Sequence, residues 1–163
     1  AISNEHNKSG ENTRAPLEVT ERNGKLVINI THTEPQVMKQ VVIFLYTAKC
    51  ELNETNDHAL LDAAGRYDIK DLKVHTGKYV SRRINLNNVL PLLKASYKYQ
   101  NTMVKQNCIE FFIQNAKEIM EMQETWKKFA EEQPQLVTEL LHWVVNKELF
   151  YAQKPKWDLQ SNW

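Results

Sequence analysis

The chain has 163 residues, 42% hydrophobic and 25% charged, enough to bury a core in one compact domain, or one with an appendage, without disulfides or metal. Its formal net charge is +1, from 21 basic and 20 acidic residues, so it lacks the basic surplus of a nucleic-acid-binding protein. No apolar run approaches the length of a membrane span, so we expect neither a nucleic-acid nor a membrane partner.

The two cysteines, Cys50 and Cys108, lie in no metal-ligand spacing, which is typical of a protein in a reducing compartment. We therefore expect a nuclear or cytoplasmic location, with Cys108 packed as a small apolar residue in a helix core. Residues 1–16 are polar and lack the apolar core of a secretory signal. Because the chain does not begin with Met, we expect a fragment or a processed chain.

The predicted β structure is small. Residues 1–24 carry two of the four glycines and few apolar residues, so we expect loop or extended chain there. The β-branched run at residues 25–30 follows Asn23-Gly24 and predicts a strand. Further along, residues 50–52 are consistent with a short edge strand.

Between these two segments, residues 37–46 are almost continuously apolar. The preceding Thr-Glu-Pro-Gln has the form of a capping box, in which the Thr33 side chain accepts a hydrogen bond from the backbone N–H of Gln36. Residues 41–46 alone fit a buried strand, but the cap and the length of the apolar run favour a buried helix.

From residue 55 onward the apolar residues recur at helical spacing, and a 32-residue repeat runs through them. Each unit of the repeat is one helix pair, as in stacked helical hairpins. Two units are too few for a solenoid to stand alone, so the repeat predicts helical hairpins, with a peptide-binding solenoid as the rival fold. The matching positions are Leu60, Leu61, Ala63, Tyr67 and Lys73 and, 32 positions later, Leu92, Leu93, Ala95, Tyr99 and Lys105.

Two prolines constrain the later helices. A helix capped by Asn85 would place Pro91 too deep for its first turn, so we expect either a start near Asn88 or a kink. Pro134 breaks the preceding helix and can occupy the first turn of the last one.

The sequence carries no recognisable catalytic chemistry. The five histidines form no ligand spacing, no nucleotide-binding loop or nucleophile motif occurs, and paired carboxylates such as Glu131-Glu132 are expected to be solvated. We therefore predict no catalytic, cofactor-binding or metal site, and a protein that is not an enzyme.

Two stretches resemble signature segments of the BTB/POZ family. Residues 42–49, VIFLYTAK, resemble the FIYTG helix end of that family, and residues 60–73, LLDAAGRYDIKDLK, resemble its LLxAAxKYxxxxLK helix pair. Residues 112–116 and the positions around Trp126 and Pro134 resemble the truncated BACK-type tail of speckle-type POZ (MATH-BTB) proteins. The resemblance covers roughly residues 17 to 145.

The resemblance implies a mostly α fold with a small β element: a BTB/POZ-like α/β core that is N-terminally incomplete, followed by helical hairpins. The strands and long helix that open a complete BTB domain and carry its dimer contact are not matched, nor is a MATH domain. Ala48 stands where the family usually has glycine. The predicted division is a polar N-terminal segment at 1–16, a partial BTB/POZ core at 17–83, a BACK-like helical extension at 84–147 and a C-terminal tail at 148–163.

The family's function implies a protein-interaction adapter that recruits a cullin-3 ubiquitin ligase, through the cullin's N-terminal domain, in the ubiquitin-like conjugation pathway. The alternatives are a BTB-derived dimerisation or scaffold module, transcriptional or cytoskeletal, without a ligase role, and a helical-repeat peptide binder. The cullin-contacting residues that the resemblance implies are Val19, Glu21, Val42, Tyr46, Tyr67 and Asp68.

Four of these residues also have a purely structural interpretation. Val19 and Val42 can instead be packing residues, and Tyr46 a buried tyrosine. Asp68 can instead cap the helix that starts near residue 69.

The C-terminal region is expected to hold a second interaction surface, giving a homo- or hetero-oligomer. The alternative is that the apolar residues of this surface pack within the chain against Trp126 and Phe129. The tail tryptophans, Trp157 and Trp163, either dock on the body or a partner or belong to a disordered tail. The self-association candidates are Leu136, Leu140, Leu141 and Val144.

Overall fold

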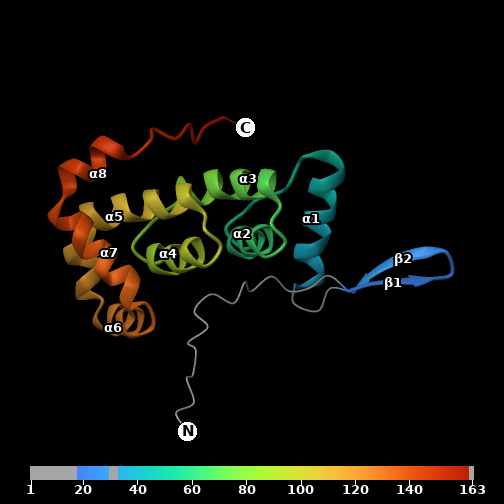
Figure 1. Ribbon diagram of the computed structural model, residues 1–163, viewed down its shortest axis with the longest axis horizontal. Helices are drawn as coiled ribbons and strands as arrows, with labels where there is room; N and C mark the ends of the chain where they lie inside the picture. The colour runs from blue at the N-terminus through green and yellow to red at the C-terminus, as the bar shows by residue number, and fades with distance from the viewer. Residues whose placement is uncertain (1–17, 30–32, 162–163) are drawn as a thin grey trace, which may run out of the picture.

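The computed structural model describes residues 18–29 and 33–161, and for 18–21 and 26–29 the backbone alone. Within this part of the chain, two short strands precede a row of helices (Figure 1). Residues 1–16 and Trp163 lie outside the described residues. The strands are β1 (Glu18–Arg22) and β2 (Lys25–Asn29), and the helices are α1 (Pro35–Thr47), α2 (Asp57–Arg66), α3 (Lys70–Ser81), α4 (Val89–Lys98), α5 (Thr102–Glu121), α6 (Gln123–Glu132), α7 (Pro134–Val145) and α8 (Lys147–Gln153).

The predicted strand at residues 25–30 is confirmed as β2, and it pairs antiparallel with β1 in a register that sets Arg22 opposite Lys25. The two residues between them, Asn23 and Gly24, both have positive φ, at 53° and 74°. That backbone is the primed turn whose twist matches a two-residue hairpin, and Asn-Gly is its preferred sequence. We predicted only loop or extended chain for β1, because an isolated edge strand of polar residues has little alternation to reveal it.

Helix α1 confirms the predicted helix at residues 37–46, but its N-terminus differs from the predicted capping box. The N-cap is Glu34, and no side chain caps the helix there. Thr33 lies one residue further out, and its hydroxyl is 2.7 Å from the Tyr67 hydroxyl. The predicted edge strand at residues 50–52 is wrong, since this segment is a loop in which the Asn56 amide donates to the Glu51 carbonyl at 2.8 Å.

The 32-residue repeat is visible in the loops as well as in the helices. Before α2, the side-chain oxygen of Asn53 accepts from the backbone N–H of Asn56, and that of Asn56 accepts from the N–H of Asn53. Before α4, Asn85 and Asn88 make the same pair of hydrogen bonds, which delays the helix to Val89 and confirms the later start.

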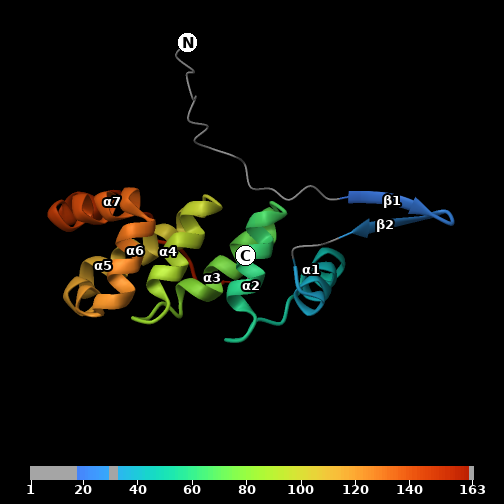
Figure 2. The same cartoon turned by 90° about the horizontal axis from the view of Figure 1, so that it is seen from below.

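The equivalent helix-to-helix turns, 32 residues apart, also share a backbone conformation. Asp68, between α2 and α3, and Gln100, between α4 and α5, have positive φ values of 52° and 55°. Helix α2 packs on α3, α4 packs on α5, and α3 packs on α5, so the two hairpins lie side by side (Figures 1 and 2). The predicted helical hairpins are therefore confirmed.

Two groups of buried residues stabilise this row. The smaller joins one face of α1 to α2 and α3, and the larger runs from α2 to α8 and includes Cys108, as predicted. In the larger one Trp126 stacks between Phe112 and Phe129, with ring centroids 5.5 and 5.7 Å apart. Beyond α8, residues 154–161 turn back towards α3 (Figure 1).

Candidate partner-binding surface

Helix α1 has one buried and one exposed apolar face. Val37, Val41 and Phe44 pack in the smaller core group. Val42 is 43% exposed and Tyr46 87% exposed, so neither is the core residue that its structural interpretation proposed. Leu45, which we did not single out, is 62% exposed on the same side. Its place three residues after Val42 is the helical spacing that would have identified it.

The residues at the α2–α3 turn are less accessible. Tyr67 is half-buried, and its hydroxyl lies 2.7 Å from that of Thr33. Asp68 does not cap α3, whose N-cap is Ile69 without a side-chain cap. The Asp68 carboxylate instead pairs with Lys73, Nζ to Oδ1, at 3.5 Å. Both residues therefore already have partners within the chain.

Val19 and Glu21 both lie in β1, opposite Ile28 and Leu26 respectively. Residues two apart on a strand point to the same face. The positions of their side chains lie outside the described part of the structure, so their contact role stays a prediction.

The predicted self-association stripe on α7 divides between two environments. Leu136 and Leu140 are buried in the larger core group, with Trp126 and Phe129 in the same group, which matches the intramolecular alternative. Val144 is partly buried against that group. Leu141 is 64% exposed and is the member of the stripe most accessible to another chain. Self-association itself stays a prediction.

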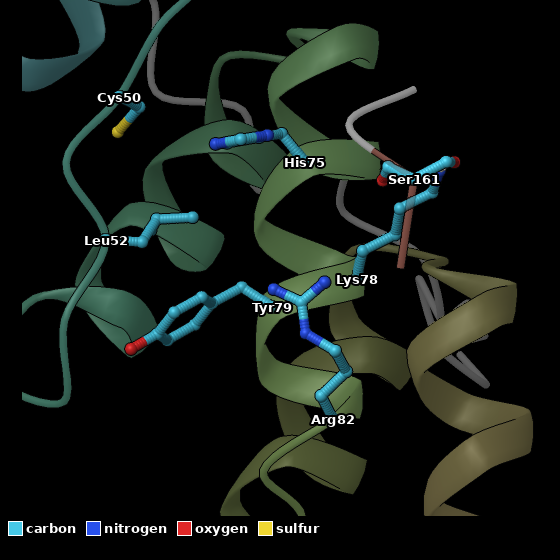
Figure 3. Close-up of a pocket in the computed structure, with 7 residues that line it drawn as sticks. All are labelled: Cys50, Leu52, His75, Lys78, Tyr79, Arg82 and Ser161. Atoms are coloured by element: carbon cyan, nitrogen blue, oxygen red, sulfur yellow. Dashed lines mark hydrogen bonds between the residues drawn. The ribbon is translucent and has the colours of Figure 1, made fainter. Parts of the chain in front are cut away.

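A hollow lies beside α3, where we predicted no site. Its volume is about 230 Å³, and it is lined by the 50–52 loop, by α3 and by Ser161 of the tail. His75 points towards Cys50, and Lys78 points towards Ser161 (Figure 3). No sequence pattern marked this hollow, because its walls come from segments far apart in the chain.

Partial burial sets the chemistry of this hollow. It lowers the pKa of His75, helped by the nearby positive charges of Arg82 and Lys78 and opposed by a hydrogen bond with the Cys50 backbone. Burial, with the charge of Glu51, raises the pKa of the Cys50 thiol. A protonated thiol is a poor nucleophile, so the raised pKa of Cys50 does not indicate covalent chemistry in this hollow.

Comparison with known proteins identifies the region around α1. Residues 14–84 match the sequence profile of the BTB/POZ domain. This stretch is a BTB/POZ domain. It contains the hairpin, α1, α2 and α3, so the predicted BTB/POZ resemblance and the mostly α fold with a BTB core are both confirmed.

The BTB/POZ domain and the helices after it also align with curated proteins. The chain is 27% identical over 139 residues to TD and POZ domain-containing protein 4 of Mus musculus, covering 82% of this chain and 37% of that protein. It is 30% identical over 117 residues to TD and POZ domain-containing protein 1-like of Mus musculus, covering 71% and 32%. It is 26% identical over 120 residues to BTB and MATH domain-containing protein 40 of Caenorhabditis elegans, covering 72% and 30%.

The chain spans about a third of the length of these relatives. A BTB/POZ domain supports a role as a protein-interaction adapter, because such domains generally serve as adaptors or scaffolds and commonly mediate oligomerisation. Among the helices that the structure describes, none has the length and apolar character needed to cross a membrane.

Proposed function

We propose that this chain is an adapter that recruits a cullin-3 ubiquitin ligase for the ubiquitination of a substrate. The proposal is carried by the apolar face of α1, where Val42, Leu45 and Tyr46 are exposed within little more than one turn of the helix. A contiguous apolar patch on an otherwise well-packed protein is typical of a surface that a partner covers.

The chemistry of this face suits a helical partner such as the cullin's N-terminal domain. Tyr46 offers a large ring, a hydroxyl and little side-chain entropy to lose, which makes tyrosine common among residues that dominate binding energy. Val42 and Leu45 flank it with apolar area worth about 25 cal/mol per Å² when water is removed. Val19 and Glu21 of β1, and the Tyr67–Asp68 turn, complete the proposed contact.

The names of the relatives support a wider proposal. Two are named for TD and POZ domains and one for BTB and MATH domains. We propose that this chain is of the speckle-type (MATH-BTB) subfamily, with residues 84–147 as a BACK-like extension. On this proposal, a separate domain in a longer parent protein binds the substrate that is ubiquitinated. Its site of action on this proposal is the nucleus or cytoplasm.

A calorimetric titration with a cullin-3 N-terminal domain tests the proposal directly. We expect the full chain to bind in the micromolar range or tighter, and Tyr46→Ala to weaken binding by about 2 kcal/mol, or about thirtyfold, as for a residue that dominates an interface. Tyr151→Ala is the matched control, since Tyr151 is an exposed tyrosine on α8, far along the chain from α1. Tyr151→Ala is expected to leave the affinity unchanged.

Absence of binding by a chain with native circular dichroism would refute the cullin role. Equal effects of the two tyrosine substitutions would refute the assignment of the α1 face. If light scattering shows instead that the chain self-associates, and Tyr46→Ala abolishes this, the same face serves the dimerisation or scaffold alternative.

A further inference from the structure

The segment after α8 lies against the helical hairpins, so Trp157 docks on the body of the chain. Its first anchor is an ion pair between Lys154 and Glu110 of α5, Nζ to Oε2, at 3.1 Å. The second is the Trp157 indole, whose N–H donates to the side-chain oxygen of Gln106 on α5 at 3.3 Å. The aromatic anchor thus lies three positions after the basic one.

The other end of the segment is held by cations of α3. Lys78 donates to the carbonyl oxygen of Ser161 at 3.3 Å and to its hydroxyl at 2.8 Å. Arg82 donates to the carbonyl of Leu159. Two of these three bonds go to backbone carbonyls, which any peptide carries, so α3 here binds main chain as a peptide-binding groove does.

The lysine at this end of the groove, Lys78, is buried. The residue is only 8% exposed, and burying an ammonium group is unfavourable unless hydrogen bonds or an anion compensate. The tail supplies neutral oxygens to Lys78, and the carboxylate of Asp158 lies nearby. The pKa of that carboxyl is lowered, chiefly because it accepts hydrogen bonds from the backbone N–H groups of Gln160 and Ser161.

The tail does not fill the groove. Beside Trp157 and Asp158, between α3 and the start of α5, remains a cavity of about 460 Å³ whose walls include Lys70, Val74 and Met103. This is within the size range of sites that take a ligand. A segment with bulkier side chains would bury more apolar surface here than the tail does.

We propose that the groove between α3 and α5 is a recognition site for an extended segment of a partner protein, for which the tail is an intramolecular competitor. The charges define the segment. It carries a basic residue to meet Glu110, an aromatic residue three positions later to meet Gln106, and an acidic residue next, facing Lys70 and Lys78. This site does not depend on the cullin contact of α1 and gives the chain a second binding surface.

Fluorescence anisotropy with a labelled peptide of residues 154–161, KPKWDLQS, tests the proposal on the full chain. In wild type the tethered tail competes at high effective concentration and weakens apparent binding. We expect Trp157→Ala in the protein, which loosens the tail, to bind the probe at least about tenfold tighter than wild type. In that background we expect Lys78→Met or Arg82→Met to lose at least about tenfold, and Lys128→Met on α6 to change nothing.

Arg82→Met is included because Arg82 is exposed, so this variant is expected to fold even if Lys78→Met does not. A probe with lysine in place of its aspartate is expected to bind at least about tenfold more weakly, since it would face the cations of α3. Failure of the probe to bind the folded Trp157→Ala chain would overturn the proposal, as would equal binding by the Arg82→Met and Lys128→Met chains. Neither result would bear on cullin binding through α1.

Discussion

Replacing Gly65 with alanine should destabilise the protein, although glycine-to-alanine changes inside helices usually stabilise by about 0.5–1 kcal/mol. A Cβ atom on Gly65 would lie 2.6 Å from Cβ and 2.8 Å from Cδ1 of Tyr99, and would overlap Cγ as well. Cβ and Cγ are next to the Tyr99 backbone, so rotating the ring does not remove the overlap and the end of α4 has to move. Overpacking of this kind costs about 1–3 kcal/mol, which leaves a net loss of about 1–2 kcal/mol.

Urea denaturation followed by circular dichroism measures this loss. With a slope of about 2 kcal/mol/M, the midpoint should fall by about 0.5–1 M. Gly77→Ala is the matched control, because its Cβ would meet the mobile end of Met103 at 2.8 Å and Val104 Cγ2 at 3.3 Å. We expect it to change stability by less than about 1 kcal/mol, since Met103 can move aside. A Gly65→Ala chain as stable as wild type, or one more stable than Gly77→Ala, would refute the argument.

Three further predictions probe other features. Ala48 ends α1 with φ of 55°, a left-handed conformation that costs a non-glycine residue about 1–2 kcal/mol, so Ala48→Gly should raise the melting temperature by about 2–4 °C after its unfolded-state entropy is offset. Burial lowers the pKa of His75, so its contribution to stability is full above the unfolded pKa and is lost as pH falls through the lowered native pKa. Urea titrations at pH 7 and pH 5 should therefore show a smaller loss for His75→Gln than for wild type, while exposed His58→Gln follows wild type. Leu140→Ala should cost about 2–5 kcal/mol, whereas Leu141→Ala should cost below about 1 kcal/mol and, if α7 self-associates, lower the oligomeric fraction in sedimentation.

Local features of this fold were predictable because their causes are local. Apolar residues at helical spacing predict amphipathic helices. From residue 55 onward, each segment with this spacing is a helix in the described structure. The position of Pro91 left two alternatives, a start of α4 near Asn88 or a kink, and the helix starts at Val89 after Asn88. Loop 50–52 was mistaken for a strand because a short apolar pair does not reveal whether a neighbouring strand exists.

The candidate surfaces were only partly predictable. The resemblance selected Val42 and Tyr46, and both prove to be exposed, but it passed over Leu45 between them. It also placed Leu136 and Leu140 in a self-association stripe, yet both are buried within the chain. An apolar stripe specifies that something covers it, and the covering element follows from the packing of α5, α6 and α7 together.

By itself, the sequence determined the helical content, the 32-residue repeat, the BTB/POZ signature and the absence of any recognisable catalytic motif. The Asn-Gly turn and the two Asn-x-x-Asn loops belong with these, because hydrogen bonds between near neighbours need no distant partner. Only the tertiary structure decided that Thr33 meets Tyr67, that Gly65 receives Tyr99, and that the tail binds Lys78. These contacts join residues 34 to 83 positions apart, and such pairs become adjacent only when the helices pack.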